Sequence, residues 1–191
     1  MARTHGRKST VQAWIVLNAD DPESASAFAI ARAQLEGGAA LEGLRRVRVF
    51  ELSGPLPSLR DVEALLHRST QFYNPHKERC FVRTSGGDPA PLVEDERAAI
   101  VWERGGDRRA AAERWWLHET GKKIEVREGA AWLARFAPEA SQSAALEALV
   151  QVRDRRHGLL CNPHSQDYRV AGDEIPLPWW TGVAADEEGR P

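Results

Sequence analysis

The tripeptide Asn74-Pro75-His76 occurs again 88 positions later, as Asn162-Pro163-His164. At the same offset Val82 matches Val170. Each tripeptide follows an amphipathic helical pattern and precedes the last strand-like run of its region. A tripeptide match alone is weak, but the same match at the same place in two strand–helix–strand–helix–strand series indicates an internal repeat. The sequence therefore predicts two copies of one small α+β unit.

The first unit is expected at residues 11–85. Apolar or alternating runs at 11–17, 45–52 and 79–83 predict strands. One helix begins after Asp21, an N-cap followed by proline at the first helical position, and ends near Gly37-Gly38. A second helix begins after Ser58, which can also cap.

A glycine- and proline-rich linker at 86–97 separates this unit from the second, at 98–172. The second unit repeats the order: a strand at 98–102, a helix at 109–119, a strand pair at 123–127 and 131–136 hinged at Gly129, a helix around Leu146, and a last strand. We expect two tandem ferredoxin-like α/β sandwich units, each with two helices on one face of an antiparallel sheet. A flexible basic arm (1–10) and a tail with a Pro/Trp segment (173–191) flank them.

Composition limits the class of protein. With 42% hydrophobic and 28% charged residues the chain should fold, and a formal charge of −2 disfavours nucleic acid as a partner. No run approaches the ~20 apolar residues of a membrane helix, and the first residues precede no apolar signal segment. The two cysteines, Cys80 and Cys161, form no motif. These features predict a reduced, cytoplasmic protein that does not bind membranes.

The residues that could carry chemistry form no convincing constellation. His76 and His164 lack a second ligand at metal-binding spacing, and Cys161 lies near His157 and His164 only in sequence, so buried packing explains it better. Isolated glycine pairs make no phosphate-binding loop. We expect no catalytic, cofactor or metal site. The Asn-Pro pairs are most simply turns, because proline restricts the preceding residue to extended conformations.

Seven tryptophans are many for this length. Trp179-Trp180 follows prolines in the tail, and two alternatives are open for it. The pair either folds back over an apolar patch or forms a docking strip for a partner.

The second unit resembles the PurS family, the small subunits of phosphoribosylformylglycinamidine synthase in purine biosynthesis. The resemblance lies in Leu159-Leu160-Cys161-Asn162-Pro163 and in Asp167-Tyr168-Arg169-Val170, and it covers about 75 residues. The first unit fits more loosely, through Leu65-Leu66 and Asn74-Pro75-His76-Lys77-Glu78. Where the family usually has apolar residues after Asn-Pro, this chain has His164-Ser165 and His76-Lys77.

The resemblance implies a non-catalytic subunit of an ATP- and glutamine-dependent ligase complex. PurS proteins dimerise through their sheets and bridge a synthetase subunit (PurL-like) and a glutaminase subunit (PurQ-like) for ammonia transfer. A tandem chain would supply that dimer as one molecule, with further self-association possible. The interface candidates are Asn74, Pro75, His76, Asn162, Pro163, His164, Tyr168, Trp179 and Trp180. The alternative is a ferredoxin-like small-molecule-binding protein or enzyme with a site between the two units.

Overall fold

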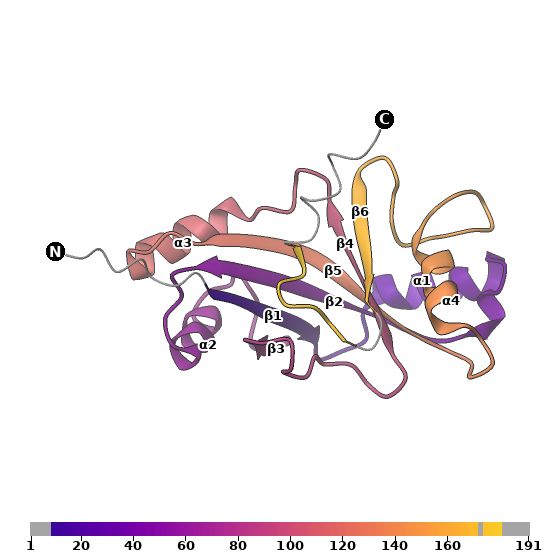
Figure 1. The fold of residues 1–191 in the computed structure, drawn as a ribbon, viewed down its shortest axis with the longest axis horizontal. Helices are drawn as coiled ribbons and strands as arrows, with labels where there is room; N and C mark the ends of the chain where they lie inside the picture. The colour runs from indigo at the N-terminus through magenta and orange to yellow at the C-terminus, as the bar shows by residue number, and fades with distance from the viewer. Residues whose placement is uncertain (1–8, 172–173, 181–191) are drawn as a thin grey trace.

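The computed structural model describes residues 9–171 and 174–180, so the predicted arm up to residue 8 and the end of the tail lie outside the described residues. It is an α+β structure in which six strands form one antiparallel sheet, in the order β3-β1-β2-β5-β4-β6 (Figure 1). The strands are β1 Ser9–Leu17, β2 Leu41–Gly54, β3 Glu78–Arg83, β4 Arg97–Glu103, β5 Glu125–Phe136 and β6 Gln166–Ala171. The helices of the described residues are α1 Pro22–Gln34, α2 Leu59–His67, α3 Ala110–Thr120 and α4 Gln142–Val150, with a short 3-10 turn, η1 Gly38–Ala40.

The strand order is the same when it is followed from either edge of the sheet to the centre, with β3 matching β6, β1 matching β4 and β2 matching β5. We call residues 9–83 the first half and 97–171 the second half. The ladders give the matching residues: Ala13 pairs with Phe50 and Val82, as Ala99 pairs with Trp132 and Val170. Residues that occupy the same place in the two sets of ladders are called corresponding residues below.

The sequence predicted a sheet for each unit, whereas the structure has one sheet shared by both. The two long strands β2 and β5 pair with each other from Leu41–Phe136 to Ser53–Glu125. Each half alone would leave its longest strand on an edge, with a row of unpaired backbone groups. Pairing the two edges satisfies these groups, which is the physical reason for the difference.

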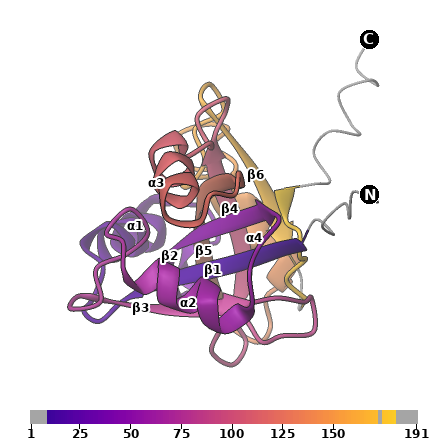
Figure 2. The same ribbon diagram turned by 90° about the vertical axis from the view of Figure 1, so that its left-hand side faces the viewer.

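The core clusters under the helices combine residues of both halves. The helices α2 and α3 share one core cluster over β1 and β2, and α1 and α4 share another over β4 and β5. These two pairs lie at opposite ends of the sheet (Figure 1), and Figure 2 shows α2 and α3 together at the near end. Both clusters lie on the same face of the sheet. Phe50 pairs with Glu128, and Trp132 pairs with Arg46, four residues away along each strand. Side chains separated by an even number of residues in a strand point to the same face. The first helix of each half therefore lies against the long strand of its own half, α1 on β2 and α3 on β5, and completes a core cluster with residues of the other half.

The opposite face of the sheet is covered by residues 174–180, which we call the strap. Ile175, Trp179 and Trp180 of the strap share a core cluster with Trp14 and Ile100 of the sheet. The sheet is thus buried on both sides in its middle, although no second layer of helices covers this face in the described part of the chain.

Local predictions met mixed outcomes. Asp21 and Ser58 cap α1 and α2 through their side chains, as expected. The hinge predicted at Gly129 is wrong, because β5 is one continuous strand. A Cβ atom at Gly129 would lie 3.0 Å from the Ile100 and Trp180 side chains, so this glycine permits close packing of the strap rather than a bend.

Candidate functional site

The two Asn-Pro-His segments form the same turn. The Oδ1 atom of Asn74 accepts a hydrogen bond from the His76 N–H at 3.0 Å, and that of Asn162 accepts one from His164 at 3.0 Å. The carbonyl of each asparagine also accepts the N–H four residues on, at 2.9 and 2.8 Å. The prediction of a structural turn is confirmed at both places.

The turns lead into β3 and β6, the two outermost strands, so the structure places the interface residues predicted in the two turns at opposite edges of the sheet (Figure 1). His76 and His164 are both exposed. No group of three or more metal-ligating side chains occurs among the described residues.

At the β6 edge, Pro163 and Tyr168 line an open pocket of about 500 Å³ together with an ion pair between Arg104 and Asp167, whose Nη2 and Oδ1 atoms are 2.7 Å apart. The Tyr168 hydroxyl donates to the Glu147 carboxylate and so ties β6 to α4. Burial, together with this bond, raises the pKa of Tyr168 to about 12. The hydroxyl therefore acts as a hydrogen-bond donor at neutral pH.

The β3 edge has the same frame with different side chains. Arg79, which corresponds to Asp167, donates from Nε to Oδ1 of Asn18 at 3.1 Å. Burial raises the pKa of the Cys80 thiol to about 12, and that of Cys161 in the second half to about 11. Both thiols stay protonated, and the packing role predicted for Cys161 is confirmed by its 3% exposure.

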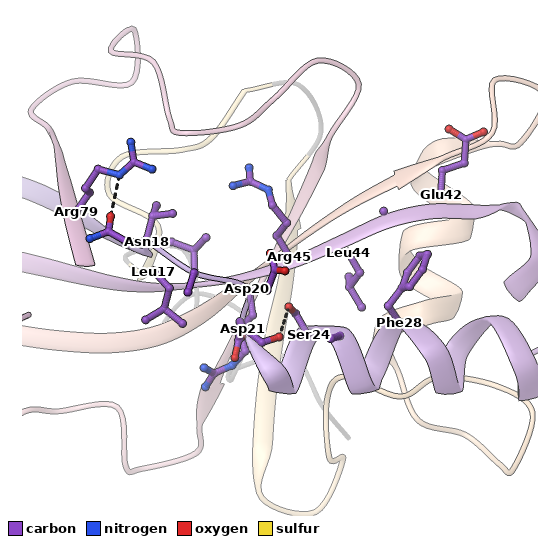
Figure 3. Close-up of a pocket in the computed structure, with 16 residues that line it drawn as sticks. Leu17, Asn18, Asp20, Asp21, Ser24, Phe28, Glu42, Leu44, Arg45 and Arg79 are labelled. Atoms are coloured by element: carbon purple, nitrogen blue, oxygen red, sulfur yellow. Dashed lines mark hydrogen bonds between the residues drawn. The ribbon is translucent and has the colours of Figure 1, made fainter. Parts of the chain in front are cut away.

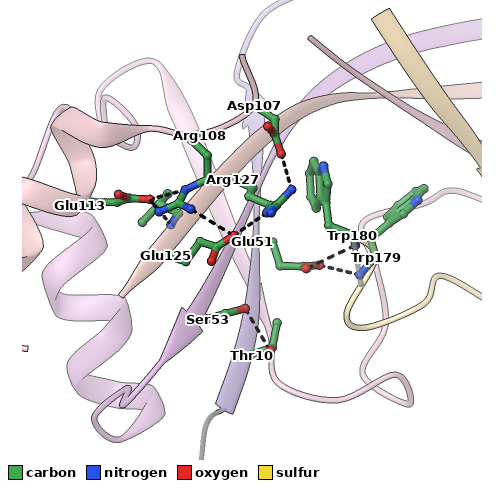
Figure 4. A network of polar contacts seen from close by, with 11 residues as sticks. Thr10, Glu51, Ser53, Asp107, Arg108, Glu113, Glu125, Arg127, Trp179 and Trp180 are labelled. Carbon is green, nitrogen blue, oxygen red and sulfur yellow. Dashed lines mark hydrogen bonds and ion pairs between the residues drawn. The ribbon is translucent and has the colours of Figure 1, made fainter. Parts of the chain in front are cut away.

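Trp179 and Trp180 fold back against the sheet and are buried, which confirms the first of the two alternatives for the tail. Their backbone N–H groups donate to the carboxylate of Glu51, at 2.6 and 3.4 Å (Figure 4). Glu51 itself is 3% exposed. As folded, these tryptophans hold the strap to the sheet.

A polar cavity between the halves was missed by sequence reasoning. It has a volume of about 220 Å³ and lies on the helix-bearing face, where Arg46 and Arg48 of β2 meet Arg109 and Glu128 of the second half. The Glu128 carboxylate is 2.8 Å from Arg109 Nε and 3.5 Å from Arg48 Nη1. The alternation of 45–52 contained the signal, because it places two arginines on the same face as Phe50 and Leu52.

A larger pocket of about 550 Å³ opens where β1 ends (Figure 3). One wall is the β2 segment 42–47, and the other is the 18–21 loop with the start of α1. Asp21 was predicted only as a helix cap, and the pocket beside it depends on where β1 stops relative to β2. That is a tertiary feature with no local sequence signal.

The charged groups and thiols at these sites have defined surroundings. The described arginines of the central cavity lie close to carboxylates, and the thiols are protonated. None of the described helices combines the length and apolar character required to cross a bilayer. Comparisons with family models, curated proteins and solved structures found no match to this chain.

Proposed function

We propose that this chain is a non-catalytic, tandem PurS-like subunit of a cytoplasmic phosphoribosylformylglycinamidine synthase, bridging its synthetase and glutaminase subunits during purine biosynthesis. The observation that carries the proposal is the sheet whose strand order is the same from both edges. Two three-stranded β-α-β-α-β units joined edge to edge through their long strands produce this order, and the resemblance to PurS implies such a joining through sheets for a dimer.

Corresponding hydrogen bonds support the duplication. The Asn18 N–H donates to the Lys77 carbonyl at 2.9 Å, and in the second half the Arg104 N–H donates to the Ser165 carbonyl at 2.8 Å. These bonds join the end of the first strand of each half to its Asn-Pro-His turn. The residue types at the two places differ, Asn18 and Lys77 against Arg104 and Ser165, so the two halves agree here in backbone geometry and not in sequence.

The two edges suit a bridging role because they have the same backbone turn but side chains of different charge. The first turn is followed by Lys77 and Arg79, the second by Ser165 and Asp167. Two different partners could each recognise one edge, while the shared sheet fixes the distance between them. Fusion of the two units also replaces a bimolecular association by an intramolecular one.

The experiment is co-purification of the tagged chain with the synthetase and glutaminase subunits of its own organism, followed by an assay of glutamine-dependent synthase activity. The interface variant is His76→Ala with His164→Ala, since both imidazoles are exposed and their removal should leave the fold intact. The matched control is His118→Ala, an exposed histidine on α3 away from both turns. We expect the double variant, but not the control, to weaken the complex.

Deletion of the gene gives an independent test. If the chain is the bridging subunit, the deletion strain should require added purines for growth. Normal growth without purines, or a synthase that assembles fully without this chain, would refute the proposal.

The central cavity favours the alternative of a small-molecule site between the halves. It has convergent charged groups from both halves, although neither His76 nor His164 lines it. Arg46, Arg48 and Arg109 reach it and are paired there with Glu23 and Glu128, so the ligand to test is a small anion that displaces these carboxylates. Under this alternative, phosphate or a dicarboxylate should raise the melting temperature, and Arg48→Met should abolish the rise.

A further inference from the structure

The strand β2 continues past the end of β1 and has a free edge there. The last β1–β2 pair is Ile15–Arg48, whereas β2 pairs with β5 from Leu41 onward. Along residues 42–47, β2 therefore has a strand on one side only. This free edge forms one wall of the 550 Å³ pocket (Figure 3).

The backbone groups that face this open side can be identified. In the second half, Val126 and Glu128 direct their backbone groups away from β2, toward residues 107–109. Since residues of a ladder alternate in direction, the odd residues of β5 bond to the odd residues of β2. The even residues Leu44 and Arg46 therefore point N–H and C=O into the open side. Among the described residues, no hydrogen bond outside the strand ladders reaches either backbone.

The corresponding edge of the second half is filled by the chain itself. The Arg109 N–H donates to the Val126 carbonyl at 2.9 Å, and the Glu128 N–H donates to the Asp107 carbonyl at 2.8 Å. Arg108 forms an antiparallel bridge with Arg127. The loop 104–109 is long enough to add this short strand, whereas the loop 18–21 of the first half is two residues shorter and leaves the edge open.

The pocket supplies side-chain contacts as well as backbone groups. Phe28 and Leu44 form apolar walls, and Leu17 is 38% exposed beside them. The Nε atom of Arg46 and the Oδ2 atom of Asp21 are buried without a hydrogen-bond partner. The Glu23 carboxylate lies 3.3 Å from Arg46 Nε but is itself 60% exposed, so a ligand can displace it.

We propose that the β2 edge at Leu44–Arg46 binds an extended segment of a partner protein as an added antiparallel strand. Such strand addition draws affinity from the backbone and specificity from alternate side chains. The segment should carry an apolar residue toward Phe28 and Leu44. In the second half, Glu128 of β5 pairs with Arg109 of the added strand. Arg46 of β2 corresponds to Glu128 and has the opposite charge. The segment should therefore carry an acidic residue toward Arg46. This site needs only the open edge and is independent of the assignment to a purine synthase.

The test is selection of phage-displayed random heptapeptides on the full chain. The matched variant replaces 18–21 with the sequence of 104–109, which should fill the edge as it is filled in the second half. We expect the selected peptides to combine an acidic and an apolar residue, to bind the native chain at least tenfold more tightly than the variant, and to slow amide exchange at Leu44 and Arg46. No enrichment, equal binding to the variant, or protection only at β3 or β6 would overturn the proposal.

A charge reversal keeps the test decisive if the loop variant fails to fold. Arg46→Glu should weaken the selected acidic peptides about tenfold and strengthen peptides in which lysine replaces the acidic residue. Arg60→Glu, an exposed reversal on α2 at the opposite end of the sheet, is the control and should change neither. Loss of both peptide types in the Arg46 variant, or no change in either, would contradict the assigned contact.

Discussion

The two halves differ on the face of the sheet that carries the strap. In the first half, Gln12 pairs across the ladders with Glu51 and Arg83, and all three side chains are almost fully buried. The corresponding residues of the second half are Ala98, Leu133 and Ala171, which are also buried. One backbone frame therefore holds a polar trio at one place and an apolar trio at its counterpart.

The polar trio explains why the strap lies where it does. Arg83 donates to the Ile175 carbonyl at 3.0 Å, Gln12 donates to the Pro176 carbonyl at 2.8 Å, and Glu51 accepts from Trp179. Buried polar groups are costly unless they are bonded, so the trio requires the strap just as the strap requires the trio. The comparison teaches that the ladders preserve the frame while side chains in equivalent places take separate roles.

The largest effect is expected from Arg83→Ala. Arg83 is 1% exposed, and besides the strap it donates to Gln12 and to the carbonyls of Gly86 and Asp88. Removing one member of a buried polar network costs about 3–5 kcal/mol. Urea unfolding should show this loss of stability, with Arg79→Ala, an exposed arginine on the same strand, changing it by only about 0.5 kcal/mol. A loss below about 1 kcal/mol for Arg83→Ala would show that the trio does not hold this face.

A triple change sharpens the comparison by giving the first half the residues of the second. Gln12→Ala, Glu51→Leu and Arg83→Ala together remove the buried charges along with their partners. Replacing a complete buried polar set costs less than breaking it, so the triple variant should lose less than the roughly 3–5 kcal/mol of Arg83→Ala alone. The strap should lose its anchors, and the fluorescence of Trp179 and Trp180 should shift to the red. A triple variant less stable than the single one would contradict the coupling.

Much of the frame was predictable from local sequence, because caps and alternation are local signals. Asp21 and Ser58 begin their helices as predicted, and the match of Val82 with Val170 reappears as equivalent ladder partners of Ala13 and Ala99. The single sheet and the core clusters shared between the halves were not predictable in the same way. They depend on which strand edges pair with each other. The alternation at 45–52 fits an edge strand as well as a central strand, so it does not predict the pairing of β2 with β5.

The candidate sites divide in the same way. The Asn-Pro-His turns were found because their hydrogen bonds are local, within four residues. The central cavity and the free edge of β2 were missed because each arises from strands far apart in sequence. Only the two arginines at positions 46 and 48, on an otherwise apolar face, gave a sign of the cavity.

A smaller effect is expected from Tyr168→Phe, which removes a hydroxyl that has no counterpart at the corresponding Cys80. Loss of its bond to Glu147 should cost about 1 kcal/mol at neutral pH. Since the folded pKa of Tyr168, about 12, lies above the ordinary value near 10, the contribution is complete below pH 10 and is lost as pH rises toward 12. Unfolding of the native chain and the variant at pH 8 and pH 11.5 should therefore converge at the higher pH. A difference that persists unchanged would assign the effect to packing.

The smallest effect concerns His157, which lies in the 151–161 connection that the first half replaces with the shorter 68–73. Its Nδ1 atom is 2.9 Å from Asp154, and its Nε2 atom is 3.2 Å from Glu36, which follows α1. The hydrogen bond to Asp154, followed by the charges of Asp154 and Glu36, raises the pKa of His157. The imidazolium thus adds an ion pair between the two halves.

Because the folded pKa is raised, this stabilisation is complete below pH 6.5 and is lost as pH rises through the folded pKa. His157→Gln should flatten the melting temperature between pH 5.5 and 8.5, whereas His76→Gln, an exposed imidazole in the first-half turn, should not. The effect should shrink in 0.5 M salt, since exposed ion pairs are screened. If the pH dependence survives His157→Gln, the two halves are held at this point by the backbone bond from the Glu36 N–H to the Arg156 carbonyl, at 3.0 Å, and not by charge.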